Sequence, residues 1–336
     1  MPLVSVLALC YNHQAFLEDA LQSLASLPDE VEVWIADDAS SDGSADILRR
    51  WQRRFPGWNF VFHSENRGNC ATFNELLTRA GGDWILDFAT DDVLLADQLL
   101  PWAEKAASFP GAGFCYADAW LFSRLKGPFR KFSSLRKGRP FPEGMILQEV
   151  FSPGLICPPA VLFSRSALLE TGGYNEALSY EDMDCWLRLS RRFPVCRFEQ
   201  EVILYRQHAD SMSARIYRGR NTRHLQSSLE ILRQVLEWKE FQPLPASLAV
   251  FIRYHLRLCF FLQLPGEASL FYDLLNKNGQ AGRLDRLLSR LSSQLPGLPD
   301  LFCLLHQGRQ LLQETWQTGS RNGVEGGRAR QVTGVT

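Results

Sequence analysis

The chain has 336 residues, 46% of them hydrophobic, and a formal net charge of −1. This length and composition are enough to bury a substantial core and predict one large domain or two modest ones. Because a nucleic-acid-binding protein usually presents a basic face, the near-neutral charge argues against nucleic acid as a partner. The eight cysteines are scattered, with no CxxC pair, so we expect reduced thiols, a cytoplasmic protein and no metal–thiolate site.

The segment from residue 3 to residue 87 alternates apolar, β-rich runs with runs of helical periodicity. Strands are predicted over 3–9, 31–36, 60–62 and 83–87, and helices over 15–27, 45–55 and 71–80. The pair Gly81-Gly82 ends the third helix. Strands that alternate with helices are typical of a parallel, doubly wound sheet, so the predicted fold class is α/β.

Polar clusters follow three of these four strands. They begin at Tyr11, at Asp37-Asp38 and at Thr90-Asp91-Asp92. Since an open α/β sheet binds ligands at the carboxyl ends of its strands, we expect these clusters to converge along one edge. Hard carboxylate oxygens suit Mg²⁺ or Mn²⁺ carried on a diphosphate. The alternative for Asp91 and Asp92 is a turn that caps a helix over 93–100, because Asp-Asp is common at turns.

The second half of the chain contains a basic loop and a helical region. Residues 125–142 are rich in Lys, Arg, Gly and Pro and predict a long mobile loop, which would either face an anionic substrate or be a solvated insertion. Further on, the pattern becomes helical: segments are predicted over 225–236, 248–264, 267–276, 283–295 and 300–316. Residues 319–336 have almost no large apolar groups and are expected to be disordered.

The longest apolar stretch runs from 246 to 264 and contains Arg253, His255 and Arg257. An arginine at a bilayer centre costs roughly 2.5–3.5 kcal/mol on insertion scales, so we expect a buried helix and not a membrane span. A peripheral contact with the inner face of a membrane stays open.

In this order the motifs resemble the family 2 glycosyltransferases of the GT-A fold, which use nucleotide-diphospho-sugars. The resemblance is carried by Val4-Ser5-Val6 to Tyr11-Asn12, Ala36-Asp37-Asp38-Ala39-Ser40-Ser41-Asp42-Gly43, Asn66-Arg67-Gly68, Ala80-Gly81-Gly82-Asp83-Trp84-Ile85 with Thr90-Asp91-Asp92, Gly172-Gly173-Tyr174-Asn175-Glu176, Tyr180-Glu181-Asp182-Met183-Asp184 and Tyr205-Arg206-Gln207-His208. It implies a GT-A domain over 1–215. The helical region over 216–318, to which the resemblance does not extend, and a tail over 319–336 follow.

The resemblance also implies roles on the donor side. Asp92 would be the direct ligand of Mg²⁺ or Mn²⁺, and Asp91 would contact the ribose. Asp38 would hydrogen-bond the nucleobase, Tyr11 would pack against it, and Leu9 would line the same pocket. The alternative for Tyr11 is a half-buried core aromatic.

Three further residues have two interpretations each. Arg67 would reach the base or the phosphates, or is an ordinary surface arginine. His208 would be a metal ligand or a phosphate partner, or is structural. Asp182 would be the general base of the reaction, or only a helix N-cap. We expect Asp184, two residues further on, to be a solvent-facing helix residue.

The resemblance therefore implies an inverting glycosyltransferase. It would move a sugar from a nucleotide-diphospho-sugar, with UDP favoured, to a carbohydrate or glycolipid hydroxyl in glycan or surface polysaccharide assembly. One alternative is a nucleotidyltransferase that makes the donor, although such enzymes usually carry a Gly-rich, basic loop where this chain has Cys10-Tyr11-Asn12. The other is a non-catalytic scaffold that works through its helical region. Homo-oligomerisation through that region stays open.

Overall fold

The computed structural model describes residues 4–123, 129–136, 138–208, 211 and 222–292. The helix expected over 300–316 and the tail over 319–336 lie outside the described residues. In the described part the strands are β1 Val4–Cys10, β2 Glu32–Asp37, β3 Asn59–Phe62, β4 Trp84–Ala89, β5 Val93–Leu94, β6 Phe114–Phe122, β7 Arg130–Lys131, β8 Val161–Ser164 and β9 Val195–Arg206. The helices are α1 Leu17–Leu24, α2 Ser44–Arg54, α3 Asn69–Arg79, α4 Ala96–Ser108, α5 Arg165–Thr171, α6 Glu181–Arg192, α8 Arg223–Leu236, α9 Ala246–Leu262, α10 Pro265–Lys277 and α11 Arg283–Leu291.

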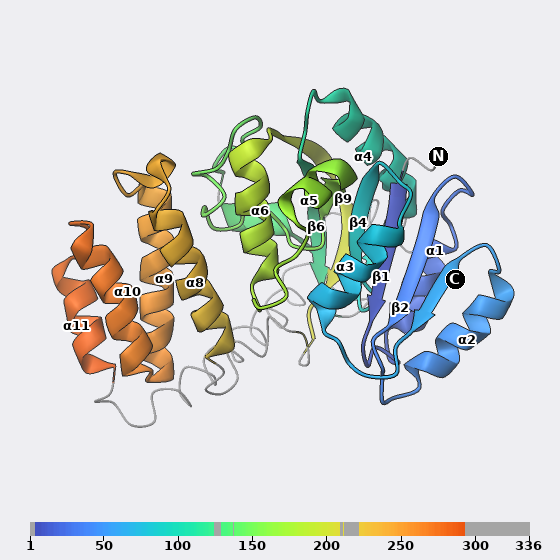
Figure 1. Ribbon diagram of the computed structural model, residues 1–336, viewed down its shortest axis with the longest axis horizontal. Coiled ribbons are helices and arrows are strands. Elements are labelled where there is room, and N and C mark those ends of the chain that lie inside the picture. Colours follow the sequence, from blue (N-terminus) through green and yellow to red (C-terminus); the bar gives the residue numbers. More distant parts are fainter. Residues whose placement is uncertain (1–3, 124–128, 137, 209–210, 212–221, 293–336) are drawn as a thin grey trace, which may run out of the picture.

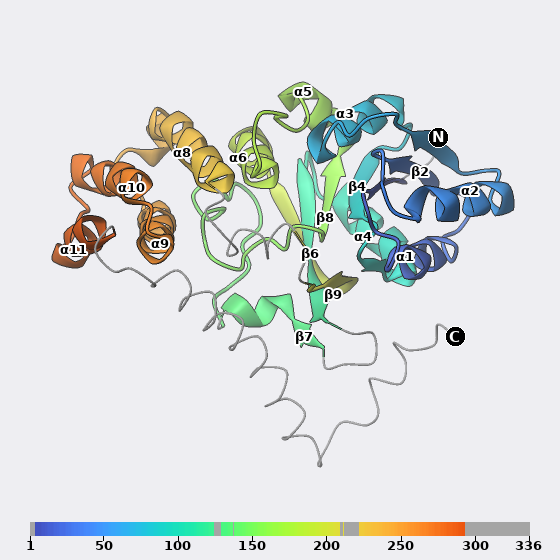
Figure 2. The ribbon, with the colours of Figure 1, turned by 90° about the horizontal axis from the view of Figure 1, so that it is seen from below.

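A single mixed sheet forms the centre of the molecule, with strand order β3-β2-β1-β4-β8-β6-β9-β5 and β7 paired to β6. The strands β3, β2, β1 and β4 run parallel, and β8 is antiparallel to its neighbours β4 and β6. Helices α3, α5 and α6 cover one face, and α1 and α4 cover the other (Figures 1 and 2). The predicted α/β fold with helices on both faces is confirmed.

Strand β1 shows why the sheet is covered on both sides. All seven of its residues are buried, as expected for a central parallel strand that reads as a continuous apolar run. Side chains from one face of β1, such as Leu7, join a core with α3 and α6, and those from the other face, such as Val6, join a core with α1, α2 and α4. The buried strand therefore fixes the position of the loop that follows its carboxyl end.

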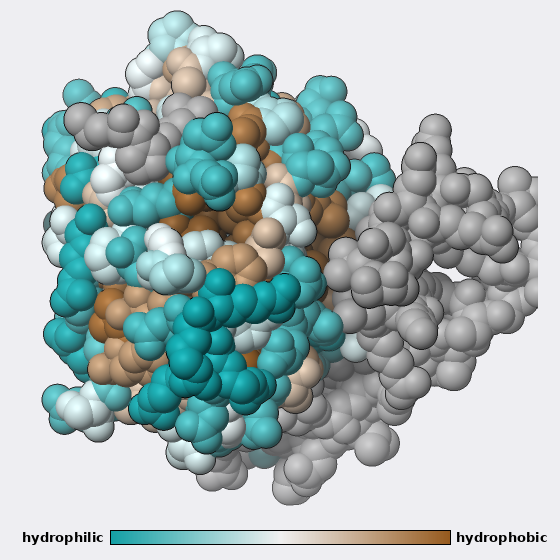
Figure 3. Space-filling model, turned by 90° about the vertical axis from the view of Figure 1, so that its right-hand side faces the viewer, coloured by the Kyte–Doolittle hydropathy of each residue, from teal (hydrophilic) through white to brown (hydrophobic). Residues whose placement is uncertain are grey.

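A row of stacked aromatic side chains lies along the outer strand β3. The rings of Phe55 and Trp58 stack with centroids 4.4 Å apart, and those of Phe60 and Phe62 continue the row along the strand. The guanidinium of Arg49 lies over Phe62. Figure 3 views the molecule from this side and shows brown apolar residues between larger teal hydrophilic areas.

The predicted C-terminal helices are present as α8–α11, and they lie at one end of the molecule with α8 beside α6 (Figure 1). Buried residues of α8, α9 and α10 belong to the same apolar core as α3 and α6. The apolar stretch from 246 forms α9, in which His255 is buried. None of the helices in the described ranges is long and apolar enough to cross a membrane.

Two local expectations were wrong. No helix starts directly after Asp92: Val93 and Leu94 form the short strand β5 against β9, and α4 begins only at Ala96. The basic loop is also less open than expected, because its described part contains β7 and a 3₁₀ helix over Phe132–Arg136. Arg136 is buried, and its guanidinium donates a hydrogen bond to the carbonyl of Pro140 within the same loop.

Gly82 provides a test of the packing between β1 and the turn before β4. A Cβ at Gly82 would lie 2.6 Å from both the backbone nitrogen and the Oγ of Ser5. We therefore expect Gly82→Ala to reduce the free energy of unfolding by about 1–3 kcal/mol, the range for overpacking. Gly57→Ala is the control, because nothing lies within 4 Å of a Cβ there. Equal urea midpoints for the two variants would contradict this packing.

Candidate active site

The loops after β1, β2 and β4 meet at one edge of the sheet. The register places Leu9 opposite both Ala36 and Ala89, so the three strands end side by side. Leu9 is buried at this edge, while the Tyr11 side chain is 46% exposed. About half of the Tyr11 surface is therefore open to solvent at this edge.

The first two loops are locked together by hydrogen bonds. The backbone nitrogen of Asn12 donates to Ser40 Oγ at 2.9 Å, and that of His13 donates to Ser44 Oγ at 3.0 Å. In return, Asn12 Oδ1 accepts from the backbone nitrogen of Ser41 at 2.8 Å. Asn12 has a φ of 57°, a left-handed conformation that asparagine tolerates better than most residues. These bonds hold Tyr11 in place without using its ring.

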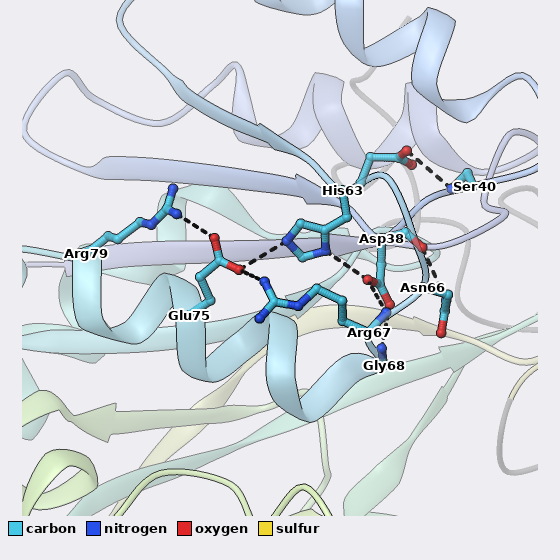
Figure 4. A network of polar contacts seen from close by, with 9 residues as sticks. Asp38, Ser40, His63, Asn66, Arg67, Gly68, Glu75 and Arg79 are labelled. Atoms are coloured by element: carbon cyan, nitrogen blue, oxygen red, sulfur yellow. Dashed lines mark hydrogen bonds and ion pairs between the residues drawn. The ribbon is translucent and has the colours of Figure 1, made fainter.

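Asp38 lies at the centre of a polar network (Figure 4). Its Oδ1 accepts from the backbone nitrogen of Arg67 and contacts His63 Nδ1, both at 2.9 Å, and its Oδ2 accepts from the backbone nitrogen of Gly68 at 2.8 Å. Burial alone would raise the pKa of Asp38, but the bonds from His63, Arg67 and Gly68 hold this pKa below its ordinary value. Asp38 thus fixes the loop before α3.

The same network occupies the side chain of Arg67. Its guanidinium pairs with Glu75, which also contacts His63 Nε2 at 3.2 Å and pairs with Arg79. His63 and Glu75 were not among the residues predicted for the site. The available signal for His63 was its position, since it directly follows the predicted strand over 60–62 at the ligand edge.

Asp91 and Asp92 have different surroundings. Asp91 Oδ2 lies 2.9 Å from His208 Nε2, whereas Asp92 Oδ1 accepts from the backbone nitrogen of Arg206 at 2.7 Å. Burial raises the pKa of Asp92 well above its usual range, and the charge of Asp91 adds to this effect. For Asp91, burial is outweighed by the bond to His208 and by the neighbouring imidazoles, so its pKa is lowered. The structure therefore pairs His208 with Asp91 and buries Asp92.

The Asp91–His208 pair fits a divalent cation whose other ligands come from a diphosphate. His208 Nδ1 is buried and has no hydrogen-bond partner among the residues the structure describes. A carboxylate oxygen and an imidazole nitrogen are both suitable donors, and Mg²⁺ is commonly held by one or two carboxylates plus substrate phosphates. Within the described ranges no group of three or more His, Cys, Asp or Glu could hold a metal without such help.

A second acidic cluster lies at the start of α6. Burial, followed by the Glu181 carboxylate, raises the pKa of Asp182 to about 8. Asp182 Oδ1 accepts from the backbone nitrogen of Met183 at 2.6 Å, and Glu181 Oε1 accepts from Asn69 Nδ2 at 3.3 Å. On β4, burial raises the pKa of Asp87 to about 7 although Tyr174 donates to it. Such a carboxyl is more basic than a solvated one, which suits a general base.

Asp182 is not the N-cap of α6, because Tyr180 holds that position. The expectation for Asp184 was also wrong. Asp184 is 3% exposed and its Oδ2 lies 2.8 Å from Arg188 Nη2. Arg188 in turn donates to the carbonyls of Thr171 and Gly173. The pair therefore anchors the Gly172-Gly173 turn to α6.

The start of α3 connects the two acidic regions. The backbone nitrogen of Gly68 donates to Asp38 at the edge of the sheet, and the side chain of Asn69 donates to Glu181 on α6. Leu9, Tyr11, Asp38, Arg67 and Asp91 thus lie around one edge, and the acidic start of α6 is tied to it through one turn of chain.

Comparison with known proteins shows which family the chain resembles. Residues 5–170 match the family model for glycosyl transferase family 2. The uncharacterized protein MT1568 of Mycobacterium tuberculosis is 29% identical over 227 residues, which are 64% of this chain and 70% of the relative. The putative teichuronic acid biosynthesis glycosyltransferase TuaG of Bacillus subtilis is 26% identical over 220 residues, or 63% of this chain and 82% of TuaG.

Two solved structures share the fold. The mannosyltransferase PcManGT from Pyrobaculum calidifontis, in complex with GDP-Man and Mn²⁺, is 16% identical with a TM-score of 0.57, covering 93% of this chain and 88% of that one. S. aureus TarS 1-349, in complex with UDP-GlcNAc, is 16% identical with a TM-score of 0.62, covering 92% and 91%. The fold and motifs define a glycosyltransferase of the GT-A type, and the chain belongs to glycosyltransferase family 2.

The Asp38 network gives a testable pH dependence. Because the pKa of Asp38 is lower in the folded chain than in the unfolded chain, its stabilising effect is full above about pH 4 and is lost as the pH falls through the folded pKa. We expect Asp38→Asn to lower the free energy of unfolding by about 1–3 kcal/mol near neutral pH and by less in acid. The measurement is the free energy of unfolding in urea, near neutral pH and again below about pH 4.

Asp46→Asn is the control for this experiment, because Asp46 pairs with Arg49 on the surface and its side chain is 80% exposed. An Asp38→Asn variant as stable as this control at neutral pH would show that the network does not hold the loop.

Proposed function

We propose that this glycosyltransferase inverts the anomeric configuration of a sugar that it transfers from a nucleotide-diphospho-sugar, with uridine as the nucleoside, to an acceptor hydroxyl. The observation that carries the proposal is the pairing of Asp91 with His208 at the sheet edge, across the Gly68-Asn69 turn from a desolvated Asp182. The Asp91–His208 pair would hold a cation on the leaving diphosphate, and the Asp182 carboxylate would accept the proton of the acceptor hydroxyl.

On the donor side, Tyr11 would stack on the nucleobase, since its ring is exposed and its loop is fixed. Leu9 would form the floor of the same pocket. Asp38 and Arg67 would act chiefly by shaping the loop around the base, because the side chains of both already have protein partners. A base N–H would add a further bond to the Asp38 carboxylate, which has about four lone-pair sites.

Asp91 and His208 would hold Mg²⁺ or Mn²⁺ together with the donor diphosphate. Such a cation acts as a Lewis acid and stabilises the charge that develops on the leaving group. The sequence suggested Asp92 for this role. We reassign it to Asp91, because Asp92 is 2% exposed and bonded to the Arg206 backbone. The presence of Mn²⁺ in the complex of PcManGT supports a metal in this fold.

On the acceptor side, Asp182 would take the proton from the attacking hydroxyl. Its raised pKa makes the carboxylate a stronger base than an exposed aspartate. In-line attack with the diphosphate leaving on the opposite side would invert the configuration. Sequence similarity to TuaG, whose name refers to teichuronic acid biosynthesis, supports an acceptor in surface polysaccharide assembly.

The metal assignment distinguishes two adjacent residues. We expect Asp91→Asn to weaken Mn²⁺-dependent binding of UDP by at least about tenfold, because a first ligand matters no less than an outer partner, whose loss costs about 10–100-fold. Asp92→Asn is the matched control and should bind nearly as wild type, since the carboxyl of Asp92 is buried and its pKa is raised. Calorimetric titration of UDP with and without Mn²⁺ measures both, and the reverse result would restore Asp92 as the ligand.

The base assignment is tested by Asp182→Asn, which keeps the size of the side chain but accepts no proton. Turnover should fall by about 10²–10⁴-fold while UDP affinity stays unchanged. Because the base must be deprotonated, wild-type turnover should also rise with pH up to about 8, the pKa of Asp182. A variant with wild-type turnover, measured as nucleoside diphosphate release from UDP-sugars, would remove Asp182 from the mechanism.

A further inference from the structure

Helix α6, which begins with Glu181-Asp182, is contacted at both ends by the C-terminal helical region. Figures 1 and 2 show α8 beside α6 in both views. At the start of α6, the backbone nitrogen of Ser179 donates to Ser227 Oγ at 2.9 Å. The ring of Tyr180 lies 4.4 Å from the ring of His224, centroid to centroid. Both Ser227 and His224 belong to α8.

At the other end, Arg191 lies in the last turn of α6. Its guanidinium stands 4.3 Å from the centre of the Trp238 ring, and its Nε lies 3.2 Å from Glu240 Oε1. Trp238 and Glu240 form part of the link between α8 and α9. The region after residue 222 therefore contacts α6 near both of its ends.

The support is itself rigid. His255 of α9 is 1% exposed and contacts Ser228 Oγ through Nε2 and the carbonyl of Phe251 through Nδ1, both at 3.0 Å. Burial lowers the pKa of His255 to about 3, so this imidazole is neutral at ordinary pH. The ring of Phe251 stacks near that of Tyr180, with centroids 6.3 Å apart. These contacts join α8, α9 and the turn before α6 into one packed unit.

External support matters because α6 lacks a conventional cap. Tyr180 occupies the N-cap position and gives no side-chain cap bond. A Ser, Thr, Asp or Asn at this position would normally fix the first turn. Here the bond from Ser179 to Ser227 and the packing of Tyr180 on His224 do so from outside the helix.

We propose that the C-terminal helices hold the first turn of α6 in place, and that Ser227 and His224 are positioning residues for Asp182. The proposal rests on the function proposed above, in which Asp182 is the base. It gives the helical region a role within the reaction, separate from any partner that the region binds. A shift of about 1 Å at a reacting group can cost about a hundredfold in rate, so a small loosening of this turn would be measurable.

The chain offers a closely matched pair of variants. Ser227 and Ser228 are adjacent serines of α8, both buried and both hydrogen-bonded. Only Ser227 contacts the turn before α6, since Ser228 contacts His255 and the carbonyl of His224. Ser227→Ala and Ser228→Ala therefore each remove one buried hydroxyl from the same helix, and they differ in whether the direct hydrogen bond to the turn before α6 is lost.

Two measurements on the full chain test the proposal. Hydrogen exchange of the amides from 179 to 183 should be faster in Ser227→Ala than in wild type, and clearly slower in Ser228→Ala than in Ser227→Ala, because only Ser227 bonds directly to this turn. Turnover of UDP-N-acetylglucosamine or GDP-mannose with Mn²⁺, whichever wild type uses, should fall by about 10–100-fold in Ser227→Ala, with unchanged affinity for the nucleoside diphosphate. Ser227→Thr keeps the Oγ and should restore both properties.

The outcomes separate this proposal from the proposed function. Wild-type exchange and turnover in Ser227→Ala, or equal losses in Ser228→Ala, would overturn the positioning role even if Asp182→Asn is inactive. Should Ser227→Ala not fold, His224→Phe replaces it: this variant keeps a ring against Tyr180 and should show a smaller loss than His224→Ala. If wild type uses neither donor, the exchange rates decide.

Discussion

Carboxylates brought out of water at the edge of a parallel sheet set the conditions for the rest of this site. The register of β1 with β2 and β4 gathers the acidic loops, and each buried carboxylate then needs a partner. Asp38 receives backbone amides and His63, and Asp91 receives His208. Asp182 has weaker hydrogen bonding of this kind, so burial raises the pKa of its carboxyl instead. One constraint thus produces both an anionic pair suited to a cation and a carboxyl suited to proton transfer.

Hydrogen bonds join the sheet edge that carries Asp38 to the start of α6. The Gly68-Asn69 turn donates hydrogen bonds to Asp38 and to Glu181. The same turn therefore contacts both the edge of the sheet and the start of α6. The C-terminal helices hold α6 from the opposite side through Ser227 and Arg191. The helical region therefore shares one core with the catalytic sheet, although the sequence resemblance stops before it.

Much of the fold could be predicted from the sequence because its signals are local. Alternating periodicities located the first four strands and three helices, and the strand ends located Tyr11, Asp38 and Asp91. The choice between Asp91 and Asp92 could not be made in this way. It depends on which carboxylate faces His208 and which faces the Arg206 backbone, and both partners come from a part of the chain more than a hundred residues away. The burial of Asp184 and the contacts between α8 and α6 are likewise tertiary, so no local pattern reports them.

We propose that the sheet edge binds a nucleoside diphosphate through a cation on Asp91 and His208. A crystal structure of the full chain with Mn²⁺ and UDP, with data collected at the manganese absorption edge, tests it most directly. We expect an anomalous peak within bonding distance of Asp91 and His208, with the uracil ring against Tyr11. A peak at Asp92 without contact to Asp91, or a nucleotide bound away from this edge, would contradict it.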